Sequence, residues 1–581
     1  MAHSQLTACS CLTQLSSGEH TRAATGLISL QEKTTQHVDS EFDNSLWATD
    51  VMIDRVPQFI RLIRTDRRSF VIRLETKVTG EKVQSVDHQL SELVTLRLLN
   101  QHEKWPVKLV KGKINPEKVT SPTESPAASQ QSNQLCLYFL KQLPKKVYRL
   151  NAVKIEFKTT EERFRWESEI SCRIAEFKRP RRLLVYINPY GGKGLARKIY
   201  SRQVAPIFKF VGIQTSVVIT QRRNHMMDEL KDMDYSVFCS YDGILAVGGD
   251  GLWNELVTGA LFRQQTHMNI DHNDCRVKLS RPRVRLGAIP AGSTNSICLT
   301  AFGTGDAFTA ALHIILGRNS WVDVLSVHEG AAFVRFASLF AAFGSLGFVL
   351  QKSERMRCIG PCRYEMAGMS MLCGNPAYLA KIEYRPVVEG HYDSTEKMMD
   401  EFKENYMQLP ECMAECAVCT PVKSNVSSVG TRSVYTYVPS YPKHVTDVWS
   451  SVTGCVTRTV SRFSPLGLAP KSHFGDGTIE LALTRKLSRL QQVGLALKTK
   501  KGKGEQFHNP KLTLIKVTRF ALTAEPELEG EGETAKKKTG KDRGSWNIDG
   551  EYKPQTKETT HVRVHKQLIN MFASEGGGVV R

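Results

Sequence analysis

The fold of this chain is decided by one segment, Leu183-Leu184-Val185-Tyr186-Ile187-Asn188-Pro189-Tyr190-Gly191-Gly192-Lys193-Gly194. Its first five residues form a continuous apolar run, which predicts a buried strand. Asn-Pro and a cluster of glycines follow, and such residues are typical of a tight turn. A helix is expected directly after the turn, from Leu195 to Val211. A buried strand, a glycine-rich turn and a helix together predict the first unit of an α/β domain.

The same alternation continues along the chain. Further strands are expected at Thr215–Thr220, Gly243–Val247 and Leu286–Ile289. Strands that alternate with helices predict a parallel, doubly wound sheet. After Ser320 the chain is rich in strand-like segments and long polar inserts, including Glu525–Arg543. The expected fold class is therefore α/β, with a doubly wound nucleotide-binding domain at 180–330 and a β-rich second lobe at 331–581.

Three glycine-rich turns each follow a predicted strand. They are Asn188–Gly194, Gly248-Gly249-Asp250-Gly251 and Pro290-Ala291-Gly292-Ser293-Thr294-Asn295. In a doubly wound sheet these turns meet at the carboxyl ends of the strands, where glycine lets backbone N–H groups approach phosphate oxygens. The first turn does not match the G-x-x-x-x-G-K-[ST] pattern of P-loop enzymes, and no G-x-G-x-x-G with a later ribose-binding acid is present. The turns therefore predict a nucleotide-phosphate site of another class.

The chain before the α/β domain follows a different pattern. Residues 1–45 look disordered, and residues 46–177 are expected to form short strands followed by one helix capped by Thr159 or Thr160. Four side chains of this helix are expected to face a core: Phe164, Trp166, Ile170 and Ile174. A Ser/Pro/Gln-rich loop is expected at Asn115–Asn133. Strands closed by a helix that bears a tryptophan resemble a pleckstrin-homology module, which implies docking on membranes.

Charge and cysteine usage limit the possible partners and compartments. The 581 residues carry a formal net charge of +21, which favours an anionic partner such as nucleic acid, an acidic membrane face or nucleotide phosphates. The longest uncharged apolar run, Phe336–Leu350, is too short for a spanning helix and is expected to be buried core. Fourteen scattered cysteines without a signal-peptide core indicate a reducing compartment. We expect a cytoplasmic protein that touches membranes from outside.

The three turns carry a specific resemblance. They resemble the diacylglycerol-kinase catalytic domain, which sphingosine and ceramide kinases share. The matching patterns are Asn-Pro-x-x-Gly-x-Gly, then Gly-Gly-Asp-Gly with Glu255 five residues after its Asp, and then Pro-Ala-Gly-Ser-Thr-Asn. Cys412-x-x-x-Cys416-x-x-Cys419 resembles a signature of ceramide kinases. Further likeness to that family lies in 302–314, 323–328 and 545–551. The resemblance implies transfer of phosphate from ATP to ceramide or a related sphingolipid, with Mg²⁺. It also implies an acidic Golgi or plasma membrane surface as the partner, with a phosphoinositide as a candidate ligand, and no nucleic acid.

The resemblance also implies roles for individual residues. Asp250 would be the general base that takes the proton from the lipid hydroxyl, and Asp549 is a second catalytic candidate. A carboxylate beside a phosphate site can equally hold magnesium. The residues implied in binding the nucleotide and its phosphates are Asn188, Pro189, Tyr190, Gly191, Gly192, Lys193, Gly194, Thr220, Gln221, Arg222, Arg223, Asn224, Gly248, Gly249, Gly251, Glu255, Gly292, Ser293, Thr294, Arg357, Arg363, Gly550 and Glu551.

One position departs from the family pattern. Ceramide kinases usually carry an Asp five residues before the Ser-Glu pair that matches Ser353-Glu354, and this chain has Phe348 there. Either the alignment slips near Gly344, or the chain recognises the lipid head group differently. The main alternative to an active ceramide kinase is therefore a weak or inactive lipid-binding relative. NAD kinase, which shares a Gly-Gly-Asp-Gly turn, is a third candidate.

Two further segments suggest binding. The spacing of Cys412, Cys416 and Cys419 predicts three thiols on one face of a helix, a partial zinc site for which Cys455 or His444 is a candidate fourth ligand. A redox-sensitive or packing cluster is the alternative. Basic residues alternate with leucines in Arg485–Lys503, which suggests a helix for calmodulin or a membrane surface, or a solvated helix with one core face.

Overall fold

In the computed structural model, the described strands form a seven-stranded sheet and a fourteen-stranded sheet. The structure describes residues 45–574 except 54–55, 67–68, 78–82, 99–131, 388–405, 410–411, 413–415, 417, 420–442 and 525–542. Most of the two predicted polar inserts, 115–131 and 525–542, therefore lies outside the described residues.

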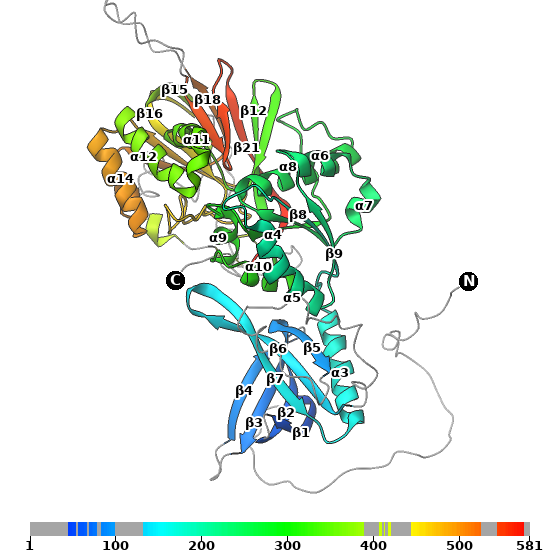
Figure 1. Cartoon of the computed structure of the whole chain (residues 1–581). Coiled ribbons are helices and arrows are strands. Elements are labelled where there is room, and N and C mark those ends of the chain that lie inside the picture. Colours follow the sequence, from blue (N-terminus) through cyan, green and yellow to red (C-terminus); the bar gives the residue numbers. More distant parts are fainter. Residues whose placement is uncertain are drawn as a thin grey trace, which may run out of the picture. The chain divides into compact units, whose positions relative to one another are not determined.

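The first part is an antiparallel sheet of seven strands in the order β4-β3-β2-β1-β7-β6-β5 (Figure 1). The strands are β1 (Ser45–Ile53), β2 (Val56–Asp66), β3 (Ser69–Lys77), β4 (Val83–Gln89), β5 (Leu93–Leu98), β6 (Gln134–Leu143) and β7 (Val147–Glu156). Helix α3 (Thr160–Ala175) follows, capped by the Thr159 hydroxyl, which accepts from the Glu162 N–H at 3.1 Å. Trp166 and Ile170 are buried in the core as predicted, whereas Phe164 is 63% exposed, so that part of the prediction is wrong.

The first sheet shares packing with the next domain. Tyr138 of β6 packs edge-on against Phe210, with ring centroids 5.0 Å apart. Arg149 of β7 forms an ion pair with Asp306 at 2.7 Å. The two predicted domains therefore contact each other through one continuous core cluster.

The predicted parallel sheet is present and has the order β11-β10-β8-β9. Its strands are β8 (Arg182–Ile187), β9 (Gln214–Ile219), β10 (Gly243–Gly248) and β11 (Arg285–Pro290). Its helices are α4 (Ala196–Ile199), α5 (Ala205–Phe210), α6 (His225–Asp232), α7 (Tyr235–Cys239), α8 (Asp250–His267), α9 (Ser296–Phe302) and α10 (Ala307–Ile315). A π turn, Tyr200–Val204, joins α4 to α5, so the expected helix at 195–211 is one irregular helix.

The second lobe continues the same sheet. β21 (Thr560–Phe572) pairs parallel with β11 and antiparallel with β18 (Leu512–Ala524), so fourteen strands form one sheet. β21 and β12 (Asn319–Glu329) run side by side (Figure 1). The other strands are β13 (Ala332–Ala337), β14 (Phe340–Gly344), β15 (Tyr378–Pro386), β16 (Lys443–Cys455), β17 (Ile479–Arg485), β19 (Ser545–Ile548) and β20 (Glu551–Pro554). The lobe is β-rich, as predicted.

The α-helices in the described part of this lobe are α11 (Ser345–Arg355), α12 (Arg363–Gly374) and α14 (Arg489–Lys501). The apolar run at Phe336–Leu350 forms the end of β13, β14 and the start of α11, and Phe336 and Phe343 are fully buried, as expected for core. Among the described helices none alone is long and apolar enough to cross a membrane, although the bent pair α9 and α10 meets both criteria together.

Candidate active site

The first and third glycine turns touch each other through their backbones. The Asn188 side chain accepts hydrogen bonds from the N–H groups of Tyr190 and Gly191 at 2.9 and 3.2 Å, which folds the first turn back on itself. Gly192 has φ +62°, and a Cβ there would lie 2.9 Å from the carbonyl oxygen of Ala291. Glycine is required at this position by both the backbone conformation and the close approach.

The second turn lies against the third. A Cβ on Gly292 would lie 2.3 Å from the Cα of Gly249, so no side chain fits between the two turns. The N–H of Gly292 donates to the Asn295 side chain at 2.8 Å, which holds the third turn in shape. The three turns that were predicted to meet are therefore packed together at the carboxyl ends of β8, β10 and β11.

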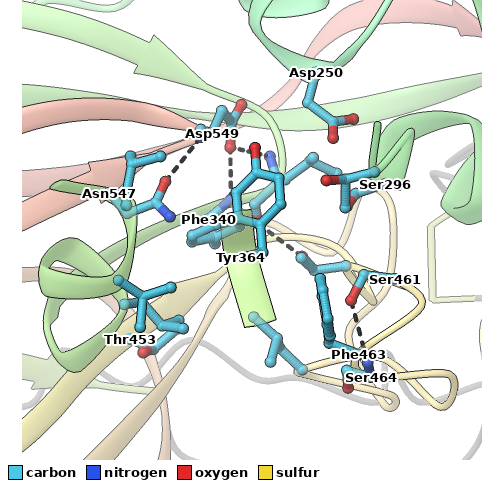
Figure 2. A pocket seen from close by; sticks show the side chains of 18 of the residues that line it. Asp250, Ser296, Phe340, Tyr364, Thr453, Ser461, Phe463, Ser464, Asn547 and Asp549 are labelled. Atoms are coloured by element: carbon cyan, nitrogen blue, oxygen red, sulfur yellow. Dashed lines mark hydrogen bonds between the residues drawn. The ribbon is translucent and has the colours of Figure 1, made fainter. Parts of the chain in front are cut away.

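Asp250 begins α8 directly after the second turn. Its carboxylate accepts a hydrogen bond from the N–H of Ile297 at 3.0 Å, in the first turn of α9. Burial raises the pKa of Asp250, while the hydrogen bonds from Ile297 and Ser296 oppose that rise. A carboxyl group held in this way, at the edge of a cavity beside Ser296 (Figure 2), has the properties of a general base.

Polar side chains from distant segments surround the turns. The Glu255 carboxylate accepts from the N–H of Asn224 at 2.9 Å. Arg223 forms an ion pair with Glu551 at the start of β20. Glu551 also reaches the second turn, because its Oε1 would lie 3.3 Å from a Cβ on Gly251. The late segment 549–551 therefore returns to the three turns, as the resemblance implied.

Asp549 has a different environment from Asp250. It is 1% exposed, and its carboxylate accepts from the N–H groups of Ser338, Leu339 and Phe340 at 2.6, 3.0 and 2.8 Å. Burial raises its pKa to about 6, and these backbone hydrogen bonds act against the rise. Both oxygens hold the turn between β13 and β14, so the geometry gives Asp549 a positioning function.

One cavity of about 900 Å³ joins the turns to an apolar chamber in the second lobe. At one end lie Asp250 and the glycine turns, and at the other lie side chains of α11, α12, α14 and the loop after β16. Figure 2 shows Tyr364 and Phe463 among these residues. Apolar residues that line the chamber include Leu346, Val349, Leu350, Met371, Leu468, Leu487, Leu495 and Phe507. A cavity with a polar end and an apolar end suits a ligand that has both characters.

Most of the predicted nucleotide residues line this cavity, but not all. The lining residues are Asn188, Tyr190, Gly191, Gly192, Thr220, Arg222, Arg223, Gly249, Asp250, Gly251, Glu255, Gly292, Ser293, Thr294, Arg363, Asp549, Gly550 and Glu551. Predicted residues absent from the lining are Pro189, Lys193, Gly194, Gln221, Asn224 and Gly248. Asn224 still takes part in the site, because its N–H donates a hydrogen bond to the Glu255 carboxylate. The side chain of Arg357 lies outside the described part of the chain.

Phe348 does not line the cavity. Its ring contacts Lys352, whose Nζ lies 5.2 Å from the ring centroid, while Leu346 and Val349 on the same helix line the cavity. The interpretation that Phe348 stands at the lipid head group is therefore wrong, because the α-helical phase turns it to another face. Ser345 and Glu354 are the polar α11 residues that line the cavity. The sequence analysis used Glu354 only to align the family motif and gave neither residue a role in binding. Ser296 was also missed, although it directly follows the third turn.

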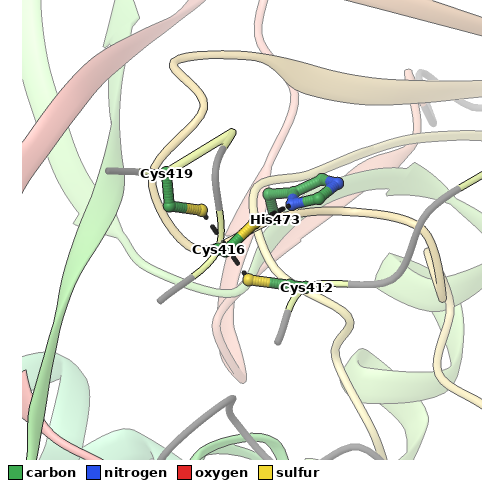
Figure 3. A group of neighbouring side chains, drawn as sticks. All are labelled: Cys412, Cys416, Cys419 and His473. Carbon is green, nitrogen blue, oxygen red and sulfur yellow. Dashed lines mark hydrogen bonds between the residues drawn. The ribbon is translucent and has the colours of Figure 1, made fainter. Parts of the chain in front are cut away.

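The three cysteines of the triad come together away from this cavity. Their fourth neighbour is His473, and the ligand atoms of all four lie within 4.8 Å of one another (Figure 3). Cys412 and Cys416 are not in a helix, so the predicted helical face is wrong. Cys455 and His444, the candidate fourth ligands, are both in β16 and are not part of the group. His473 follows Cys416 by 57 residues, so its approach depends on the tertiary fold.

Comparisons with known proteins agree with this architecture. Residues 182–327 match the family model for the diacylglycerol kinase catalytic domain, and residues 451–578 match the model for the ceramide kinase C-terminal domain. The chain is 32% identical to ceramide kinase 1 of Caenorhabditis elegans, over 79% of this chain and 77% of that protein. It is 31% identical to ceramide kinase of Homo sapiens, over 68% of this chain and 74% of that protein. The chain therefore belongs to the ceramide kinase family and is a lipid kinase that uses ATP.

Proposed function

We propose that this lipid kinase transfers the terminal phosphoryl group of ATP to the primary hydroxyl of ceramide, giving ceramide 1-phosphate and ADP. One observation carries the proposal: the glycine turns, Asp250 and the apolar chamber open into a single cavity. The names of the relatives support ceramide as the substrate.

The nucleotide phosphates are proposed to lie on the three turns. Gly191, Gly249 and Gly292 line the cavity, and their lack of side chains lets the backbone approach an anion closely. Arg222, Arg223 and Arg363 also line it and supply positive charge for a transferring phosphoryl group.

Asp250 is proposed as the general base. It lies where the turns meet the chamber, so a lipid hydroxyl that enters from the apolar end can reach both the carboxylate and the phosphate site. Its pKa is raised in the direction of neutral pH, and a base whose pKa is closer to the working pH transfers a proton more effectively in the transition state. Asp549 has the role of holding the β13–β14 turn, because its oxygens are engaged by backbone N–H groups.

Glu255 and Glu551 fit the requirements of a magnesium site. Glu255 is buried, and its Oε2 has no hydrogen-bond partner among the described residues. Burial raises its pKa, and the charge of Glu551 also raises it. Both carboxylate residues line the same cavity. Hard carboxylate oxygens beside phosphate oxygens are the ligands that Mg²⁺ prefers. When bound there, Mg²⁺ would neutralise charge on the phosphates.

The alternative of a weak or inactive relative rested on Phe348 and on the basic surface, and Phe348 gives it less support because it does not line the cavity. The apolar chamber also favours a lipid acceptor over NAD. The chamber offers Ser345 and Glu354 as polar groups for the amide and hydroxyls of a ceramide head group, with apolar walls for its chains.

Membrane docking is proposed for the helices at the chamber. Met369 of α12 and Leu490 and Leu497 of α14 are 64%, 85% and 57% exposed. The last turn of α14 carries Lys498, Lys500 and Lys501. Exposed apolar side chains beside a basic cluster fit the surface of an acidic bilayer, from which the lipid would enter. We call this surface, made by α12 and α14, the entry face.

The entry face favours a membrane over calmodulin as its partner. Gln492 of α14 is buried, and Leu495 and Thr499 line the cavity, so calmodulin would have to pull the helix from the fold before wrapping it. The antiparallel sheet closed by α3 supports a pleckstrin-homology-like docking module as a second contact, with a phosphoinositide as its proposed ligand. A cytoplasmic protein, peripheral on Golgi or plasma membranes, follows as the proposed location.

The substrate assignment is tested with purified full chain, labelled ATP, Mg²⁺ and four acceptors in mixed micelles: ceramide, sphingosine, diacylglycerol and NAD. The proposal expects label on the primary hydroxyl of ceramide in preference to the other three. Preferential labelling of diacylglycerol or sphingosine would refute the ceramide assignment while keeping the lipid kinase.

A further inference from the structure

Three thiols and one imidazole form a compact group outside the active site. The Sγ atoms of Cys412 and Cys419 are 3.7 Å apart, and the Sγ of Cys416 lies 3.2 Å from Nδ1 of His473. All four ligand atoms lie within 4.8 Å of one another. Figure 3 shows the four side chains converging on one point from separate parts of the chain. None of them lines the active-site cavity.

The distances suit a tetrahedral metal ion. Zinc–sulfur bonds of about 2.3 Å and zinc–nitrogen bonds of about 2.0 Å place ligand atoms roughly 3.5–3.8 Å apart around a tetrahedron. The Cys412–Cys419 distance of 3.7 Å matches such an edge, and the Cys416–His473 distance of 3.2 Å is slightly shorter. Because all four ligand atoms lie within 4.8 Å of one another, small side-chain movements would complete the tetrahedron. Three cysteines and one histidine are a common ligand set of structural zinc sites.

The surroundings indicate a closed site. Cys412 is 4% exposed and His473 is 1% exposed, whereas Cys416 and Cys419 are partly buried, so the group lies at the edge of the core. Gln567 of β21 donates to the carbonyl oxygens of Cys419 and Gly475 and thereby links the cysteine segment to the histidine loop. Asp323 of β12 supports the same region by accepting from the N–H groups of Gly477 and Gln567, both at 2.6 Å. The three thiols converge on one point without forming a disulfide, so all three sulfur atoms are free to bind a metal ion.

We propose that Cys412, Cys416, Cys419 and His473 bind one zinc ion that fastens the cysteine segment to the loop between β16 and β17. Four protein ligands leave no open position, so the ion is structural. The loop leads directly into the cavity wall, because the Ser472 hydroxyl donates to Glu480 at 3.3 Å and Glu480 lines the cavity. The zinc thus supports the wall of the chamber without taking part in phosphoryl transfer. This proposal is independent of the lipid substrate.

Metal analysis of untagged full chain tests the proposal. About one zinc per chain is expected by mass spectrometry of the purified protein. His473→Ala should lower the zinc content severalfold after dialysis against a mild chelator, while His473→Cys, which keeps four ligands, should retain it. Cys373→Ser, at an exposed cysteine outside the group, is the matched control and should not change zinc content.

Cobalt substitution gives a readout that does not depend on how well the alanine variant folds. The wild-type protein loaded with Co²⁺ should show an intense thiolate-to-cobalt absorption, and its pattern should change in His473→Cys. Zinc content far below one per chain would overturn the proposal, as would a Cys412–Cys419 disulfide in protein purified under reducing conditions. An unchanged cobalt spectrum in His473→Cys would remove His473 as a ligand and overturn the assignment.

Discussion

The Asp250 carboxylate accepts a hydrogen bond at 3.0 Å from the N–H of Ile297, 47 residues later in the chain. The bond ties the start of α8, which follows the second glycine turn, to the start of α9, which follows the third. The proposed base and two phosphate turns are therefore held in one rigid arrangement. Preorganised groups of this kind are what phosphoryl transfer requires from a protein.

The contact between the first and third turns predicts unequal effects at adjacent glycines. Gly192→Ala puts a methyl group 2.9 Å from the Ala291 carbonyl at φ +62°, which should cost about 1–3 kcal/mol and raise the KM for ATP. Gly191→Ala also alters the proposed phosphate turn, but its added methyl group meets only the Asn188 side chain at 3.4 Å, so it should raise the KM less. Equal KM values for the two variants would show that this packing does not shape the nucleotide site.

The helical phase of α11 predicts a sharp contrast between neighbours. Val349→Asp puts a charge into the apolar chamber and should lower kcat/KM for ceramide roughly 100-fold, equivalent to about 3 kcal/mol. Phe348→Asp, on another face, should leave it within about twofold. Initial rates measured across a range of ceramide concentrations give kcat/KM for both variants. A gain of activity in Phe348→Asp would restore the head-group interpretation of this position.

Glu480 predicts a pH dependence of stability. Burial raises its pKa to about 7 from an ordinary value of 4.5, although Tyr406 and Ser472 donate hydrogen bonds to the carboxylate. The folded state therefore binds this proton more tightly than the unfolded state. The resulting stabilisation is fully present below pH 4.5 and is lost as pH rises through 7.

Glu480→Gln keeps this side chain neutral at every pH. The Tm of the variant minus that of the wild type should therefore increase from about pH 5 to about pH 8. Differential scanning calorimetry at matched ionic strength measures the difference. If it stays constant across that interval, Glu480 does not titrate in the way proposed.

The entry face predicts a defect that depends on the presence of a bilayer. Leu490→Asp combined with Met369→Asp, two exposed positions that do not line the cavity, should weaken binding to vesicles that contain phosphatidylserine and raise the apparent KM for ceramide in those vesicles. Activity on a short-chain ceramide in detergent should remain. Val237→Asp, at a 44% exposed valine on α7, is the control. Equal vesicle binding by the double variant and the control would exclude the entry face as the surface that docks on the membrane.

The local parts of the site could be predicted from the sequence. Buried parallel strands leave continuous apolar runs, as in Leu183–Ile187, and the turns after them must contain glycine where backbones touch. Contacts made by tertiary folding could not be predicted this way. The approach of His473 to the cysteines and the N–H groups around Asp549 join distant segments. Phe348 was misplaced because a motif offset does not state which face of a helix a residue occupies.

The central claim is that Asp250 is the base at the junction of the nucleotide turns and the lipid chamber. Asp250→Asn keeps the size of the side chain and an oxygen that can accept from the Ile297 N–H. Initial rates of ceramide phosphorylation should fall roughly 10²–10⁴-fold, as for loss of a general base, while calorimetry shows nucleotide affinity near that of the wild type. A variant that retains near wild-type turnover would contradict the account and remove Asp250 as the base.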